Sequence, residues 1–331
     1  MSKKFFLTSV LLLIFFPALT TALDFSLGGS LTVRTGHQGE YVFEPLSHDR
    51  LLSYLEWDEK PLFIVGLAGS AGYTNLKLET GANLAIPTES GIVKDLDYMN
   101  VADFPSCPDS IAEILTYYTE SLCRTNALYS FNLQLSYTFT LNPLFSLVPF
   151  LGYDFQHSDQ SAWGLEGFYY DINKYRESNG YYGWYYTEGH NTKKYRSQNV
   201  EALSLVRDYH TTWLGLAASF NLNEKVTLTA KAALSPYSAI KSLDSHLLTG
   251  SLFYDDTHSW FTGGKASLSL DYKIDFHNRL FARLDFFATG RNDGMTYSAN
   301  IGSSKYTANM YSHAGADLQT WDFTLGYKYC F

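Results

Sequence analysis

Residues 131–141, FNLQLSYTFTL, alternate almost perfectly between apolar and polar side chains. A period of two is the pattern of a β-strand, because successive side chains point to opposite faces of a sheet. One face here is apolar and the other polar, as expected for a strand with lipid on one side and water on the other. Residues 265–274 and 321–331 repeat the pattern, and the last of them ends on the aromatic Phe331. We therefore expect an all-β chain that crosses a membrane with strands.

The first 22 residues, MSKKFFLTSVLLLIFFPALTTA, begin with two lysines, continue as an apolar run and end with small residues at Thr20 and Ala22. This is the pattern of a secretory signal peptide, since the apolar run is too short to span a membrane. We expect the mature protein to begin near Leu23 and residues 23–331 to form a single domain.

Charge and aromatic content narrow the classes of function. The signal peptide holds two lysines and no acid, so its removal changes the formal net charge from -9 to -11. This balance argues against a nucleic-acid partner, because phosphate binding needs clustered Lys and Arg. Aromatic residues make up 17% of the chain, and no later apolar stretch is long enough for a membrane helix. An exported, aromatic-rich chain of this kind predicts a β-barrel in a bacterial outer membrane.

Turn signals divide the chain into ten antiparallel strands of one transmembrane β-barrel. Short turns alternate with longer reversals, and barrels of this type place short turns in the periplasm and long loops outside the cell. Strands at 50–73 and 144–165 exceed the roughly 9–11 residues that cross a bilayer, so we expect them to project above the membrane. Short turns are expected at 74–75, 142–143, 223–224 and 277–278, and longer reversals at 45–49, 88–126, 170–200, 243–261 and 291–312.

Two acidic motifs fall where strands enter long extracellular loops. Asp95 and Asp97 are two residues apart in DLDYMN, and Asp244 and His246 have the same spacing in LDSH. In an extended segment such residues point to the same side, so the first pair should repel and raise each other's pKa. An Asp beside a His suits a general base, because the carboxylate stabilises the charged imidazole. Two acids facing an Asp–His pair across a barrel mouth could activate one water.

Simpler interpretations of these motifs stay open. Paired aspartates in an acidic protein are most often solvated surface acids. A calcium site could use Asp95, Asp97 and Asp103, although the spacing lacks the glycine and terminal glutamate of a known calcium loop. A second Asp/His group, at 255–258, shows how easily such patterns arise. From composition and spacing alone, a passive barrel ranks above an enzyme.

The three cysteines are too few for a disulfide framework. Cys107 and Cys123 fall in one expected loop and could pair in an oxidising compartment. Cys330 lies in the last strand, where we expect a lone small hydrophobic residue.

Four segments of the chain together resemble the omptin family of outer-membrane endopeptidases, which are ten-stranded barrels. These segments are SLGGSLTVRTGHQGEYVF, LLSYLEW, DLDYMN and LDSH, in the family's order over nearly the whole mature chain. The resemblance implies that Asp95 and Asp97 are the catalytic acidic pair and that Asp244 and His246 are the catalytic dyad. His246 would deprotonate a water held between it and Asp95, with Asp244 orienting the imidazole and Asp97 supporting Asp95. No covalent intermediate, cofactor or metal is implied, and the partners would be polypeptide substrates.

The resemblance also implies a substrate pocket. Omptins typically cleave beside basic residues, and Glu40 matches one acid of their groove. The second acid is expected two residues before Asp244, where this chain has Ser242. We therefore expect cleavage near basic residues with a relaxed or altered preference.

Two further departures concern a serine and a lipid. Ser121 matches a family serine, but Cys123 stands at the matching histidine position, so we expect Ser121 to be a surface-loop residue and not a nucleophile. Omptins depend on lipopolysaccharide, yet in GYDFQHSD only Tyr153 is retained, while Phe155 and His157 replace the expected acid and arginine. Asp208 replaces a further basic residue, so we expect a monomer among outer-membrane lipids that uses another lipid or none. An adhesin with little proteolysis, and a passive pore, are the competing functions.

Overall fold

The computed structural model describes residues 23–44, 47–98, 115–169, 171–176, 182–187, 199–303, 305 and 307–331. Within these ranges the chain consists of β-strands and their connections. No helix there is long and apolar enough to cross a membrane. Residues 1–22 lie outside these ranges, so the signal peptide stays a prediction.

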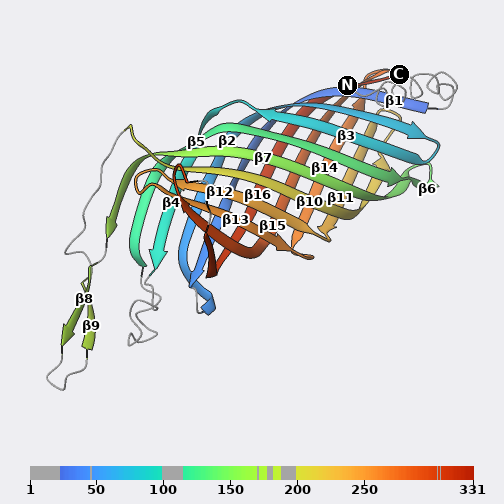
Figure 1. Ribbon diagram of the computed structural model, residues 1–331. Coiled ribbons are helices and arrows are strands. Elements are labelled where there is room, and N and C mark those ends of the chain that lie inside the picture. The colour runs from blue at the N-terminus through green and yellow to red at the C-terminus, as the bar shows by residue number, and fades with distance from the viewer. Residues whose placement is uncertain are drawn as a thin grey trace, which may run out of the picture.

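Ten strands form a closed antiparallel ring in the described part of the chain (Figure 1). Their elements are β1 (Leu23–Glu44), β2 (Ser47–Tyr73), β3 (Leu76–Ala85), β4 (Thr88–Tyr98), β5 (Leu115–Tyr137), β6 (Phe139–Asn142), β7 (Phe145–Tyr169), β10 (Glu201–Asn221), β11 (Val226–Ser235), β12 (Ser238–His246), β13 (Ser251–Ser259), β14 (Gly263–Lys273), β15 (Asn278–Asn300) and β16 (Thr307–Cys330). Four ring strands are each split in two by a short break, as β3–β4, β5–β6, β11–β12 and β13–β14. Pro87 and Pro236 lie in two of these breaks, because proline has no N–H to give to the ladder. β8 (Asp171–Arg176) and β9 (Tyr182–Thr187) pair with each other as a separate hairpin.

The first and last strands close the ring. β1 pairs with β16 from Ser26 opposite Cys330 to Phe43 opposite His313, and its other edge pairs with β2. A closed ring leaves no strand edge unpaired, which is what a sheet needs to cross lipid. The ten-stranded antiparallel barrel expected from the alternation is confirmed.

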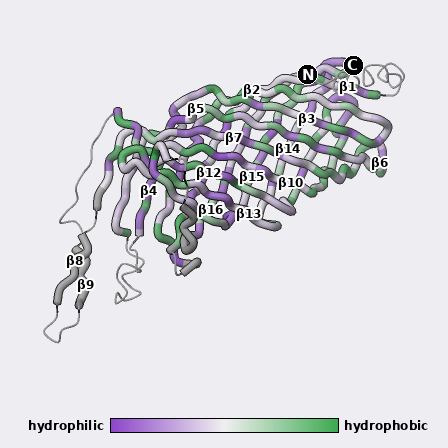
Figure 2. Tube along the Cα trace, viewed as in Figure 1, coloured by the Kyte–Doolittle hydropathy of each residue, from purple (hydrophilic) through white to green (hydrophobic). Residues whose placement is uncertain are grey.

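Large apolar side chains cover the outer face over one part of the barrel. On β5, Phe131, Leu133 and Leu135 are at least 40% exposed, whereas Ser136 points inward and is 4% exposed. Figure 2 shows hydrophobic and hydrophilic positions alternating along neighbouring strands. In water this surface would cost about 25 cal/mol per Å² left unburied, so it is a lipid-facing surface. The lipid-facing band, as we define it, runs over 27–33, 63–86, 129–151, 214–234, 268–284 and 321–331.

The short turns lie at or beside their expected positions, but three of the long reversals are shorter than predicted. The predicted loops at 88–126, 243–261 and 291–312 are wrong in extent, because β4, β5, β12, β13, β15 and β16 continue as paired strands well into them. Beyond the lipid-facing band the outer face meets water, so polar residues occupy both faces and the period of two disappears from the sequence. In the sequence, the strand parts beyond the lipid-facing band therefore resemble loops.

Candidate active site

Asp95 and Asp97 lie on β4, beyond the lipid-facing band. β4 runs between β2 and β5, so that Asp95 is opposite Leu55 on one side and Thr119 on the other. The predicted loop position is wrong, since both acids stand on a strand with hydrogen-bonded neighbours at each edge. Their spacing of two directs both carboxylates to one side of that strand. A paired strand holds them more rigidly than a loop would.

Asp244 and His246 lie on β12 and contact each other directly. His246 Nε2 is 2.6 Å from Asp244 Oδ2, and the Phe253 ring packs edge-on against the imidazole with a centroid distance of 5.1 Å. Asp244 is buried, while the His246 side chain keeps 30% of its exposure. The second Asp244 oxygen, Oδ1, is buried with no hydrogen-bond partner among the described residues. A buried carboxylate thus orients a partly exposed imidazole through one of its two ring nitrogens.

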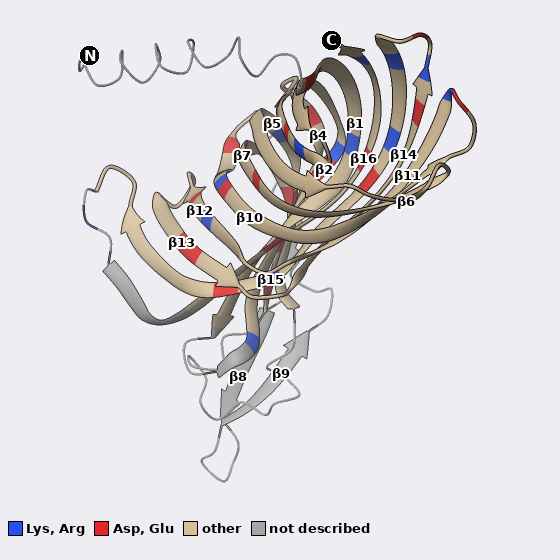
Figure 3. Cartoon of the chain, turned by 90° about the vertical axis from the view of Figure 1, so that its right-hand side faces the viewer, with Lys and Arg blue, Asp and Glu red and all other residues tan. Residues whose placement is uncertain are grey.

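The two pairs face a common interior from different parts of the ring. Going from β4 to β12, the ring passes through β5, β7 and β10, and Figure 3 shows acidic positions on β12 and β13 along this wall. Burial and the charge of Asp97 raise the pKa of Asp95 to about 8, while charged His246 acts in the opposite sense. Burial lowers the pKa of His246, but the hydrogen bond to Asp244 and the surrounding carboxylates outweigh it and raise that pKa to about 9. Asp95 and His246, 151 positions apart in the chain, thus each contribute to the pKa shift of the other.

Asp97 supports this electrostatic arrangement. Burial raises the pKa of Asp97, and a hydrogen bond with Ser53 opposes the shift. An apolar cluster that includes Leu55, Trp57 and Val93 lies beside the two acids, since Leu55 is the ladder partner of Asp95. A dry surrounding of this kind disfavours the charged form of both carboxylates.

Glu40 and Ser242, the predicted substrate-binding residues, are both buried and both contact Arg207. Arg207 Nε donates to Ser242 Oγ at 2.9 Å, Nη1 donates to the Gly39 carbonyl at 2.8 Å, and Nη2 lies 3.4 Å from Glu40 Oε2. The Arg207 side chain is fully buried. Glu40 thus already has a cationic partner within the chain.

Asp255 on β13 completes this buried group. Thr296 Oγ1 donates to Asp255 Oδ1 at 2.6 Å, and burial together with Asp244 raises the pKa of Asp255 to about 6. The residues Glu40, Arg207, Ser242 and Asp255 are called the site floor below. Sequence reasoning missed Arg207 and treated Asp255 as coincidental. The available signal was strand parity, since Leu205, Arg207 and Tyr209 are all buried and share one face of β10.

Comparison with known proteins identifies the group to which this barrel belongs. The model of the Omptin family matches residues 21–331. The chain belongs to the omptin family. Its structure is similar to the crystal structure of the outer membrane protease OmpT from Escherichia coli, with a TM-score of 0.74, 16% identity, and coverage of 93% of this chain and 97% of that one. It is also matched by the outer membrane protein OprG from Pseudomonas aeruginosa, with a TM-score of 0.36, 11% identity, and coverage of 94% and 96%.

No curated protein matches this chain in sequence. At 16% identity the likeness to OmpT shows the fold, whereas family membership supports a protease-type function. The barrel belongs in the bacterial outer membrane, as expected from the sequence. The resemblance seen in the four sequence segments is confirmed.

Two expectations about this omptin's second long reversal are wrong. Ser121 does not lie in a surface loop: it is on β5, is buried, and donates to the Gly164 carbonyl at 2.6 Å. Cys123 is also on β5 and is a buried free thiol, 3.4 Å from both Ser90 Oγ and the Asp58 carbonyl. Burial raises the pKa of Cys123 to about 12, so the thiol is unreactive. Cys107 lies outside the described residues.

The outer wall where the family resemblance implies lipopolysaccharide contacts carries aromatic and histidine side chains in pairs. His157 Nδ1 lies 2.7 Å from Asp208 Oδ1, and the His157 ring stacks on Tyr129 at 4.6 Å between centroids. Tyr153 Oη lies 2.7 Å from His210 Nδ1. Asp208 is therefore occupied by a neighbouring histidine at the position where a basic residue was expected.

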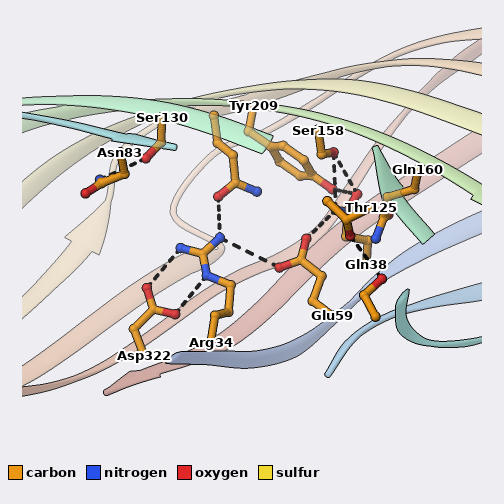
Figure 4. A network of polar contacts seen from close by, with 12 residues as sticks. Arg34, Gln38, Glu59, Asn83, Thr125, Ser130, Ser158, Gln160, Tyr209 and Asp322 are labelled. Atoms are coloured by element: carbon orange, nitrogen blue, oxygen red, sulfur yellow. Dashed lines mark hydrogen bonds and ion pairs between the residues drawn. The ribbon is translucent and has the colours of Figure 1, made fainter. Parts of the chain in front are cut away.

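A polar network crosses the barrel interior below the site (Figure 4). Arg34 donates to both oxygens of Asp322, at 2.8 and 2.9 Å, and to Gln156 Oε1 at 2.7 Å. Gln38 Nε2 donates to Glu59 Oε1 at 2.5 Å, while Ser158 and Tyr209 donate to the side-chain amide oxygen of Gln38, Oε1, at 3.3 and 2.8 Å. Side chains from β1, β2, β7, β10 and β16 thus meet across the interior, which disfavours an open pore.

Among the described residues, no three His, Cys, Asp or Glu side chains gather as metal ligands. The alternative calcium site needs Asp103, which lies outside those residues.

Proposed function

We propose that this omptin is an outer-membrane endopeptidase whose site faces the cell exterior and hydrolyses polypeptides with an Asp/His-activated water. The carrying observation is the 2.6 Å contact between His246 and buried Asp244, in an interior shared with Asp95 and Asp97. Family membership supports the protease class. The site residues carried over from the resemblance all lie on strands bordering this interior.

The mechanism assigns one role to each group. His246 takes a proton from a water held between its free ring nitrogen and Asp95, and the water oxygen attacks the peptide carbonyl carbon. Asp244 stabilises the imidazolium that forms. The carbon–nitrogen bond then breaks, and the imidazolium returns its proton to the leaving amine. The charge of Asp97 raises the pKa of Asp95, so Asp95 stays protonated to a higher pH than an isolated aspartic acid does.

This mechanism predicts that activity rises with pH. A base must be neutral to accept a proton, and the raised pKa of His246, about 9, keeps the imidazole protonated over most of the acid and neutral range. Turnover should therefore be low in acid and increase as the pH approaches about 9. Full activity in strongly acidic buffer would show that His246 is not the general base.

Quenched peptide substrates test the proposal directly. His246→Gln and Asp95→Asn should each lower kcat by roughly 10²–10⁴-fold, the usual contribution of a positioned acid or base. Asp256→Asn and His258→Gln are matched controls, because these residues repeat the i, i+2 spacing on β13 but are exposed. The proposal fails if His246→Gln keeps wild-type turnover. Binding of a host protein without cleavage by the wild type, in several lipids, would instead establish the adhesin function.

A further inference from the structure

The site floor carries its own cation. Arg207 is fully buried, and its guanidinium is held by Ser242 Oγ, the Gly39 carbonyl and Glu40. Glu40 and Ser242 are 2% and 1% exposed, so all of these contacts are shielded from bulk water. A guanidinium does not lose its proton in proteins, so the floor permanently contains a positive charge.

Arg207 lies directly beside the Asp–His pair. On the β10–β12 ladder Arg207 is opposite Ser242, and the next inward-facing position, Leu205, is opposite Asp244. Burial, with Asp244 acting in the same sense, raises the pKa of Glu40 well above its ordinary value, although Arg207 and His246 oppose the shift. The Glu40 carboxyl therefore stands in the same electrostatic field as the dyad, with Arg207 as its ion-pair partner.

Asp255 stands in the field of the same Arg207 charge. Its Oδ1 already accepts from Thr296, and Arg207 lowers its pKa while burial and Asp244 raise it. A substrate Arg or Lys entering the floor would lose its hydration, meet a Glu40 carboxyl group that Arg207 already contacts at 3.4 Å, and lie next to a like charge. Unpaired cations are strongly disfavoured in such buried positions.

We propose that Arg207 is a specificity-determining residue, which occupies Glu40 in place of a substrate cation and directs cleavage to bonds beside uncharged side chains. The inference rests on the proposed endopeptidase function. Ser242 fits this role because its neutral hydroxyl accepts from Nε and adds no second acid to the floor.

A peptide-library digest tests the preference. Wild type should show no enrichment of Arg or Lys on either side of the cut. Arg207→Ser, which removes the charge and opens space, should enrich Arg beside the cut roughly tenfold, the effect of one charge-assisted hydrogen bond. Arg207→Lys is the matched control, because it keeps the charge and should leave the preference unchanged. Arg207→Gln is the back-up variant if Arg207→Ser fails to fold. It keeps a long hydrogen-bonding side chain without the charge, and it should show the same enrichment of Arg.

A binding measurement separates this inference from the proposed catalysis. In a His246→Gln background, calorimetry with arginine amide should detect binding roughly tenfold tighter after Arg207→Ser than with Arg207 present. Arginine amide that binds no tighter without Arg207, or wild-type cuts enriched in Arg or Lys, would overturn the inference. One outcome would separate the two proposals: neither the wild type nor the Arg207 variants cleave any peptide, yet arginine amide still binds tightly only without Arg207. The endopeptidase proposal would then be wrong, and the role of Arg207 at Glu40 would stand.

Discussion

The barrel mouth and the interior below it use charge in opposite ways. In the lower network, Arg34 meets Asp322 through two hydrogen bonds, and Lys265 contacts Asp154 at 2.9 Å. At the mouth, Asp244 Oδ1 has no partner among the described residues, and the acidic pair on β4 stands in a buried setting that raises both pKa values.

This difference in charge pairing distinguishes a region that stabilises the fold from a region suited to proton transfer. An arginine–carboxylate pair such as Arg34–Asp322 has a fixed geometry that stabilises the wall, and its guanidinium does not release a proton near neutral pH. A buried acid next to other acids is costly to ionise, and such groups are typical of sites that transfer protons. The site floor combines both features, since Arg207 contacts Glu40 while burial raises the pKa values of Glu40 and Asp255.

The largest expected effect is at the mouth. Asp244→Asn should lower kcat by about 10³–10⁴-fold, because the amide no longer stabilises a charged His246. Unfolding of the barrel, followed by its heat-dependent gel mobility, should change little, since Asp244 already has an unsatisfied oxygen. A large loss of stability with normal turnover in the folded fraction would show that Asp244 has a structural role and not a catalytic one.

Asp322→Asn is the corresponding change in the lower network. Removing one partner of a mostly buried ion pair leaves Arg34 partly uncompensated, so we expect a loss of about 3 kcal/mol in the free energy of unfolding. Turnover by the folded fraction should change little, because the pair lies away from the dyad. Urea unfolding in detergent measures the first quantity, and peptide kinetics at low urea measure the second. Equal stability in the variant and the wild type would remove the structural role of the network.

Asp97→Asn should have the smallest effect on turnover and the sharpest pH signature. The charge of Asp97 helps to raise the pKa of Asp95 to about 8, so its removal must lower that pKa. The part of the pH–rate profile governed by Asp95 should shift toward acid, while kcat at its optimum falls only about tenfold. Asp256→Asn on β13 is the control, because it removes an exposed acid without touching this pair. An unshifted profile would show that Asp97 does not act on Asp95.

Much of the fold was predictable because the side-chain period of a strand is local. The alternation at 131–141 predicted a strand with a lipid face and a wet face, and the short turns followed from neighbouring residues. The upper strands were missed because water on both sides removes the alternation, so β4 and β13 resembled loops. Ser121 and Cys123 were misplaced for the same reason.

For the site, the sequence by itself determined the spacing of two that places Asp95 beside Asp97 and Asp244 beside His246, and the resemblance suggested their roles. Only the tertiary structure decided that the two pairs face one interior, and that Arg207 reaches Glu40 from 167 residues away. The physical reason is that contacts across a barrel depend on ring closure and on the register of every intervening ladder. No short stretch of sequence contains that information.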